Sequence, residues 1–229
     1  MSNDVTVYSA VACPFSHRTR MALTAKDVGY ETLEIDLLRP PDWFTAGPAK
    51  IQMPKLVSGA VIIHGASVAN EYIEERWKDP PLLPGPPAQR AEARWWINWL
   101  EERLQPTYEA ALLEITPEKH QKLRQPLEAA LRELEHRLQA RAESGCWSPG
   151  SYWNGPQLGM VDLTYAATVM RFAGLRKFHG WEMPLGLPAL SAWIETLSTD
   201  RVVHETFHEE EVLTRVGTYL DTFRAMARS

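Results

Sequence analysis

The chain has 229 residues, of which 45% are hydrophobic and 23% charged, and its formal net charge is −5 at neutral pH. This composition is typical of a globular protein that can bury a core, and the acidic balance argues against nucleic acid as the main partner. No run of about 20 apolar residues is present, so no membrane-spanning segment is expected. The N-terminus lacks a signal-peptide pattern, and the two cysteines, Cys13 and Cys146, lie far apart. These features predict a reduced, cytoplasmic protein without a structural disulfide.

The first third of the chain alternates strand and helix signals. Residues 5–10 predict a strand, 14–27 a helix with Pro14 in its first turn, and 30–37 a second strand. Two short apolar runs, 55–57 and 61–64, flank a Ser-Gly-Ala turn and predict a hairpin. A helix that runs to about residue 77 then follows, with Ser67 as its expected N-cap.

A proline-rich stretch separates this part from the rest. Residues 79–88 contain five prolines and one glycine, which exclude a helix interior or a central strand. They predict a linker between one domain at 1–78 and another at 89–229. Beyond the linker the strand signals vanish, and helical spacing of apolar residues predicts helices at 89–113, 117–141, 159–171, 188–197 and within 209–228.

Cys13 precedes the first predicted helix. There, unpaired backbone N–H groups and the helix dipole favour a thiolate, and His17 and Arg18 add positive potential one turn later. The fourth position of the motif is Ser16, so Cys13 has no local partner for a disulfide. Position alone leaves two interpretations equally open: a reactive nucleophile, or a buried cysteine that acts as a small hydrophobe.

Two further features are ambiguous in isolation. Pro54, before a strand, is compatible with an edge, a turn or a cis bond, although an ordinary loop proline is the simpler interpretation. Ser67 at a helix start is suited to a carboxylate ligand, but a plain N-cap is commoner. Of the nine tryptophans, most are expected in the core, and some are candidates for the lining of an apolar pocket.

Taken together, the order of Cys13, Pro54 and Ser67 resembles the N-terminal domain of glutathione transferases. Two later segments, 159–162 and 187–193, resemble helix starts in the C-terminal domain of that family. Within it, the chain most resembles the cysteine-type omega class, through Cys13-Pro14-Phe15-Ser16 and Pro41-Asp42-Trp43-Phe44. The resemblance implies an α/β thioredoxin-like N-terminal domain of order β-α-β-α-β-β-α, followed by an all-α helical-bundle domain.

The resemblance also implies a glutathione site without a metal. Cys13 would be the nucleophile that faces the glutathione sulfur, and Phe15 would pack beside the tripeptide. The backbone of Met53 would pair with the cysteinyl residue, next to a cis Pro54. Ser67 would bind the γ-glutamyl carboxylate.

The acceptor pocket would lie between the domains, with candidates on the first helix of the second domain: Trp95, Trp99 and Tyr108. Two positions depart from the family pattern. Ala66 stands where an acidic or amide residue is usual, and residues 45–47 lack the lysine of the omega class, for which Lys50 is a possible substitute. Both changes remove polar contacts to glutathione.

The predicted function is glutathione-dependent thiol transfer, dehydroascorbate-type reduction or reductive deglutathionylation of a small, apolar or aromatic electrophile. A homodimer is expected from the resemblance and from the surplus of apolar residues at 95–100. Two alternatives remain open: a specialised lyase or isomerase on the same fold, and a binding or regulatory protein that has lost catalysis.

Overall fold

The computed structural model of the chain describes residues 4–45 and 52–227. Its N-terminal part is a thioredoxin-like α/β domain in the expected order, β-α-β-α-β-β-α. The elements are β1 (Val5–Ser9), α1 (Pro14–Ala25), β2 (Glu31–Glu34), α2 (Asp42–Thr45), β3 (Lys55–Ser58), β4 (Val61–His64) and α3 (Ala66–Arg76).

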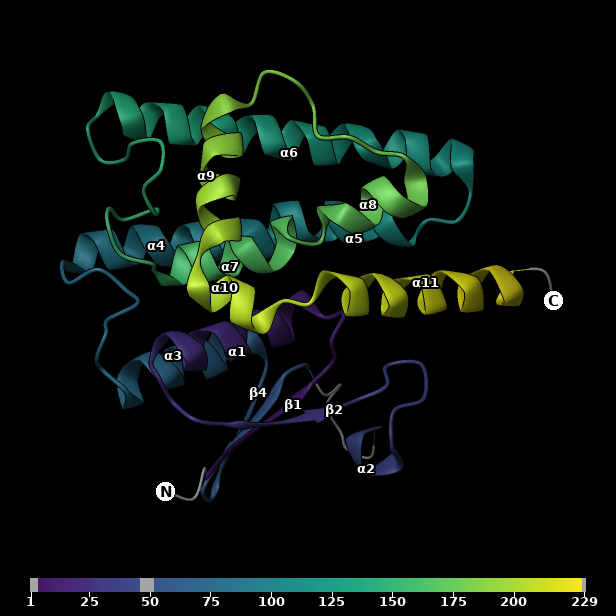
Figure 1. Cartoon of the computed structure of the whole chain (residues 1–229), viewed down its shortest axis with the longest axis horizontal. Coiled ribbons are helices and arrows are strands. Elements are labelled where there is room, and N and C mark those ends of the chain that lie inside the picture. The colour runs from purple at the N-terminus through teal and green to yellow at the C-terminus, as the bar shows by residue number, and fades with distance from the viewer. Residues whose placement is uncertain (1–3, 46–51, 228–229) are drawn as a thin grey trace.

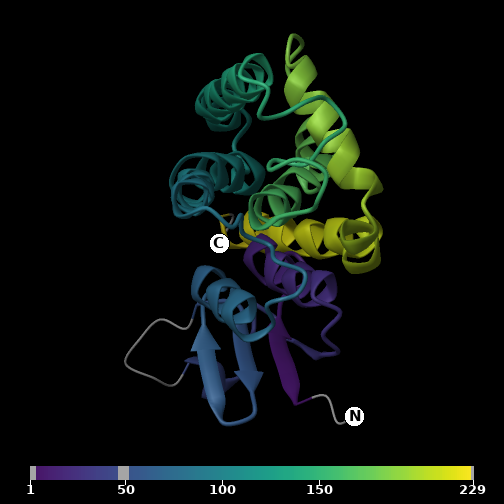
Figure 2. The ribbon, with the colours of Figure 1, turned by 90° about the vertical axis from the view of Figure 1, so that its left-hand side faces the viewer.

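The four strands form one sheet in the order β2-β1-β3-β4. β1 pairs parallel with β2 and antiparallel with β3, and β3 pairs antiparallel with β4 across the predicted turn. Val7 of β1 lies opposite Leu56 of β3, and both side chains are fully buried. Figures 1 and 2 show α1 and α3 together on the side of this sheet that faces the helical domain.

The regular elements of the C-terminal part are all helices among its described residues, apart from one isolated bridge between Tyr152 and Gly155. Its elements are α4 (Pro87–Trp99), a π-helical segment η1 (Leu100–Leu104), α5 (Gln105–Leu113), α6 (Pro117–Glu143), α7 (Met160–Val169), α8 (Phe172–His179), α9 (Pro188–Thr199), α10 (Arg201–Thr206) and α11 (Glu209–Met226). The π-helical segment interrupts the single helix predicted at 89–113. Two short helices, α8 and α10, were not predicted. α4 also begins inside the predicted linker, because proline is tolerated in the first turn of a helix.

The core of this domain surrounds α7, all ten residues of which are buried. Asp162 in its first turn accepts hydrogen bonds from the backbone N–H of Gly159 (2.9 Å) and of Trp153 (2.8 Å), and from Trp193 Nε1 (2.9 Å). Trp153 and Trp193 are fully buried and in ring contact. Asp162 therefore caps its helix and connects it to two core tryptophans.

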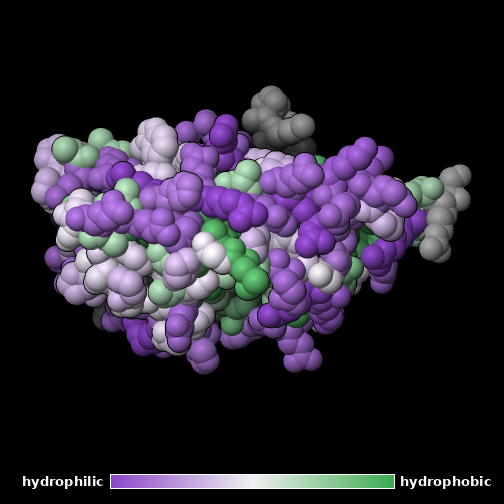
Figure 3. Space-filling view, turned by 90° about the horizontal axis from the view of Figure 1, so that it is seen from above, coloured by the Kyte–Doolittle hydropathy of each residue, from purple (hydrophilic) through white to green (hydrophobic). Residues whose placement is uncertain are grey.

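The two domains pack through α1, which contacts α7 and α10. α11, yellow in Figures 1 and 2, runs along the boundary between the domains. The outer face of the helical domain is largely hydrophilic, with a short apolar strip near its middle (Figure 3). None of the described helices is both long enough and apolar enough to cross a membrane.

Candidate active site

A cavity of about 470 Å³ opens where α1, α3 and the π-helical segment meet. Three groups of residues line it: two from α1, two that precede Pro54, and four at the start of α3, together with one acidic residue of the helical domain. They are Phe15, Arg18, Gln52, Met53, Gly65, Ala66, Ser67, Val68 and Glu101. The cavity thus includes four of the residues expected from the sequence, namely Phe15, Met53, Ala66 and Ser67.

The start of α3 is held against the segment before Pro54. The backbone N–H of Gly65 donates to the carbonyl of Pro54 over 2.9 Å. Gly65 has a φ of +82°, and a Cβ at this position would lie 2.9 Å from Gln52 Oε1, so the junction requires glycine. Gly65 is also the N-cap, which corrects the prediction that Ser67 caps this helix. Ser67 lies within the first turn, where backbone N–H groups have no partner inside the helix.

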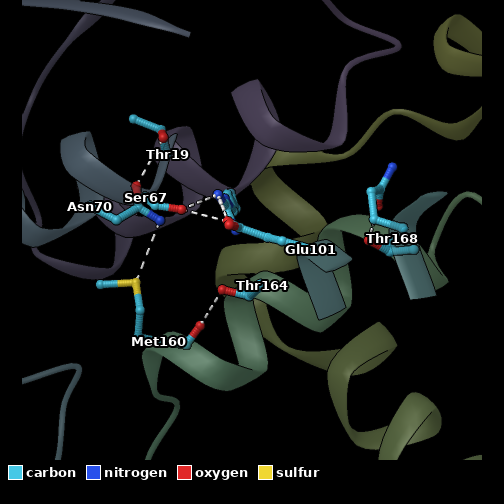
Figure 4. Close-up of polar contacts among 9 residues, drawn as sticks. Thr19, Ser67, Asn70, Glu101, Met160, Thr164 and Thr168 are labelled. Carbon is cyan, nitrogen blue, oxygen red and sulfur yellow. Dashed lines mark hydrogen bonds and ion pairs between the residues drawn. The ribbon is translucent and has the colours of Figure 1, made fainter. Parts of the chain in front are cut away.

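The Ser67 hydroxyl belongs to a polar cluster that joins both domains (Figure 4). Arg18 Nη2 donates to Ser67 Oγ (2.8 Å) and forms an ion pair with Glu101, while Ser67 Oγ donates to Glu101 Oε1 (2.5 Å). The Arg18 side chain is only 3% exposed. Burial lowers the pKa of Arg18, and the Glu101 carboxylate opposes that shift.

Part of the Arg18 guanidinium is buried without a hydrogen-bond partner. Its Nε and Nη1 have no hydrogen-bond partner among the described residues, and its Cζ lies 5.2 Å from the centre of the Phe15 ring. The cavity therefore combines a buried cation, a carboxylate and the positive end of a helix. This combination is suited to a group that carries both a carboxylate and an ammonium.

A second cavity, of about 200 Å³, shares Arg18, Ser67 and Glu101 with the first and extends between α3, α4 and α7. Asn70 and Thr164 also line it. Asn70 accepts from Thr19 Oγ1 (2.9 Å) and donates to Met160 Sδ (3.5 Å), and Figure 4 shows these contacts beside the Ser67 cluster. The Arg18–Ser67–Glu101 cluster therefore forms a wall common to both cavities.

Cys13 is the N-cap of α1 and is partly exposed. Its thiol interacts electrostatically with three arginines, Arg18, Arg20 and Arg171. Ser16, the other nucleophile in the motif, is fully buried, and its Oγ accepts from the N–H of Ala10 (3.3 Å). Of the two side chains, only the Cys13 thiol is accessible to a reactant.

Three further residues complete the comparison of the site with the sequence: Pro54, Lys50 and Glu101. The Met53–Pro54 peptide bond is cis, as the resemblance implied, and Pro54 is buried and does not line the cavity. Lys50 lies outside the described residues. Glu101 was not identified from the sequence, because no local motif separates it from its neighbour Glu102.

The expected acceptor pocket at Trp95, Trp99 and Tyr108 is not formed by these side chains. Trp99 and Tyr108 fill the core: Trp99 Nε1 donates to Glu133 Oε1 (3.0 Å), and the Tyr108 hydroxyl donates to the carbonyl of Arg171 (3.2 Å). Trp95 is 55% exposed. None of the three lines either cavity at the Ser67 cluster.

Comparisons with known proteins agree with this fold. Residues 12–76 match the family described as glutathione S-transferase, N-terminal domain, and residues 87–196 match glutathione S-transferase, C-terminal domain. The chain is 26% identical over 208 residues to glutathione S-transferase 3 of soybean (Glycine max), and the match covers 90% of each sequence. The chain therefore belongs to the glutathione S-transferase family.

Two solved structures share the fold of the whole chain. One is a tau-class glutathione S-transferase of mango (Mangifera indica), with a TM-score of 0.82, 24% identity and coverage of 96% of this chain and 100% of that one. The other is glutathione transferase Omega 3C of Trametes versicolor, with a TM-score of 0.76, 24% identity and 90% coverage of both chains. The chain thus shares its fold with members of two classes.

Proposed function

We propose that the protein is a glutathione transferase of the cysteine type, in which Cys13 carries out glutathione-dependent thiol transfer. The observation that carries this proposal is the accessible Cys13 thiol at the positive end of α1, two residues before a cavity-lining phenylalanine. A thiolate at a helix N-terminus beside cationic side chains is an effective nucleophile towards sulfur.

Glutathione would bind in the larger cavity through its γ-glutamyl group. The carboxylate of that group would accept from the first-turn N–H groups of α3 and would lie near the positive charge of Arg18, which lines the same cavity. The ammonium would bind the carboxylate of Glu101, which lines the same cavity as Ala66. Glu101 would thereby replace the acceptor that Ala66 does not provide.

The cysteinyl part of glutathione would extend past Met53, whose backbone precedes the cis bond and is suited to pairing with an extended peptide. Phe15, which lines the cavity, would pack beside the tripeptide.

The reaction would then proceed in two exchanges. The Cys13 thiolate attacks the glutathionyl sulfur of a mixed disulfide, the S–S bond breaks, and the acceptor thiolate leaves and takes a proton from water. A glutathione thiolate next attacks the adduct on Cys13, which forms oxidised glutathione and regenerates the Cys13 thiolate. A small apolar or aromatic disulfide or glutathionyl conjugate is the expected substrate class.

Mass spectrometry after incubation with oxidised glutathione tests this proposal. We expect one glutathionyl group on Cys13, which added glutathione removes. An adduct on Cys146 alone would contradict the assignment of Cys13. Retention on immobilised glutathione without any adduct would instead favour a non-catalytic binding protein, and glutathione-dependent turnover without an adduct would favour a specialised lyase or isomerase.

A further inference from the structure

Arg171, which follows α7, reaches from the helical domain to the loop before Cys13. Its Nε donates to the carbonyl of Ala12 over 3.1 Å, and its Nη2 donates to the carbonyl of Val11 over 3.0 Å. The N–H of Val11 in turn donates to Glu34 Oε1 over 2.9 Å. Val11 is therefore held from two sides, by β2 and by the helical domain, and Ala12 is held by the helical domain.

The remaining guanidinium nitrogen of Arg171, Nη1, bonds to buried groups of the protein. Arg171 Nη1 donates to the carbonyl of Ala167 (2.6 Å) and to Nδ1 of His17 (2.9 Å). His17 is fully buried, and its Nε2 lies 3.0 Å from Thr206 Oγ1, which donates to the carbonyl of Val202 over 2.7 Å. Because arginine only donates, Nδ1 of His17 must accept and Nε2 must carry the proton.

This arrangement requires a neutral imidazole at His17. Burial and the charge of Arg171 lower the pKa of His17 well below its usual value. Phe207 covers the group: its ring stacks on His17 at 5.4 Å, and the Arg171 Cζ lies 5.3 Å from the same ring. Arg171 is thus buried and is oriented by four hydrogen-bond acceptors. Its positive charge interacts with the Cys13 thiol.

We propose that Arg171 is a positioning residue for Cys13. Through it, the helical domain holds the carbonyls of residues 11 and 12 in place and keeps the thiol at the N-terminus of α1, next to a fixed positive charge. This inference rests on the proposed function of Cys13, but it concerns a residue that lines neither cavity at the Ser67 cluster.

Alkylation of Cys13 by iodoacetamide tests the proposal, with Cys146 of the same molecule as an internal reference. Arg171→Met keeps the length of the side chain but removes its charge and its hydrogen bonds. We expect it to slow alkylation of Cys13 by about tenfold, because the thiolate is the reactive form and the loop before Cys13 loses both a positive charge and its two hydrogen bonds. Arg171→Lys keeps the charge without the planar fork and should recover part of the rate. The exposed Arg176→Met serves as the control and should leave Cys13 unchanged.

A structural role alone would not produce this pattern. Unchanged alkylation of Cys13 in a folded Arg171→Met variant overturns the proposal. The proposal is also overturned if the alkylation of Cys146 slows as much as that of Cys13. In steady-state kinetics of thiol transfer, the Arg171→Lys variant should lower kcat and leave KM for glutathione nearly unchanged, because the binding cavity is intact.

If Arg171→Met does not fold, two variants of His17 provide the same test. His17→Asn keeps an acceptor for Arg171 Nη1, whereas His17→Phe removes it. We expect slower alkylation of Cys13 in the phenylalanine variant than in the asparagine variant, and equal rates would contradict the proposal. Alkylation needs neither glutathione nor an acceptor. If the protein lacks thiol transfer but alkylation of Cys13 still depends on Arg171 and His17, the proposed function is refuted and the role of Arg171 is not.

Discussion

Glu101 of the π-helical segment and Arg18 of α1 form an ion pair across the boundary between the two domains. The segment has the i→i+5 pattern of a π-helix, since the N–H of Gln105 bonds to the carbonyl of Leu100. Such single π-turns inside α-helices are frequent at functional sites. Because Glu101 comes from the helical domain, the cavity acquires its carboxylate only when the domains are packed together.

The first prediction concerns the nucleophile. Cys13→Ser should lower glutathione-dependent reduction of a mixed disulfide by more than about a thousandfold, because a serine hydroxyl is not ionised at neutral pH and does not exchange with disulfides. Cys146→Ser is the matched control, since Cys146 is exposed and remote in sequence, and it should retain activity. The rate at which the acceptor thiol is released from the mixed disulfide measures the activity of both variants. Activity that survives in Cys13→Ser would show that another group carries the reaction.

The second prediction concerns the carboxylate in the cavity. Glu101→Gln should weaken glutathione binding by about tenfold to a hundredfold, because the ammonium loses a charged hydrogen-bond partner. Calorimetry measures the dissociation constant, and a melting curve checks that Arg18, which also loses its partner, does not unfold the chain. The exposed neighbour Glu102→Gln should bind as the native protein does.

A rescue variant makes this test specific. Ala66→Glu introduces a carboxylate at the start of α3, in the same cavity, where a negative charge is favourable to the helix. In the Glu101→Gln background it should restore most of the lost affinity. If neither change affects glutathione binding, the γ-glutamyl group does not lie at this position.

The third prediction concerns stability at acidic pH. The pKa of His17 is held well below its usual value of about 6.5, first by burial and then by Arg171. Below pH 6.5 the unfolded chain therefore binds a proton that the native state does not bind. The free energy of unfolding is therefore not reduced by His17 above pH 6.5. As the pH falls below 6.5, it decreases by up to about 1.4 kcal/mol per pH unit.

Denaturant unfolding between pH 5 and 7.5 measures this slope. His17→Asn should make it shallower, because asparagine does not titrate there. Equal slopes in the native protein and in the variant would mean that the native state and the unfolded chain bind the same number of protons at His17.

The fourth prediction concerns assembly. Trp95 is 55% exposed on α4, whereas Trp96 and Trp99 beside it are buried. We expect this surface to be covered by a second copy of the chain, so that light scattering gives about twice the chain mass of 26.0 kDa. Trp95→Arg should shift the protein towards the single-chain mass, and Leu185→Arg, at a position that is 94% exposed, should not. A native protein that already runs as a single chain would contradict the prediction.

The sequence by itself determined the class of fold and the place of the candidate nucleophile. These features are local: the β-rich run in β1, the Ser-Gly-Ala turn before β4, the proline run before α4 and the position of Cys13 before α1 each depend on neighbouring residues. Where a boundary was wrong, as for the cap of α3, a glycine with positive φ displaced the residue that local preference favoured.

Only the tertiary structure decided which polar groups meet. Glu101 and Glu102 have the same local context, yet only Glu101 pairs with Arg18, which lies 83 residues earlier. Arg171 bonds the carbonyl of Val11 across 160 residues, and Trp99 and Tyr108 are in the core although helical spacing allowed them a place in a pocket. Propensity and periodicity act over a few residues, whereas these contacts depend on how whole helices pack.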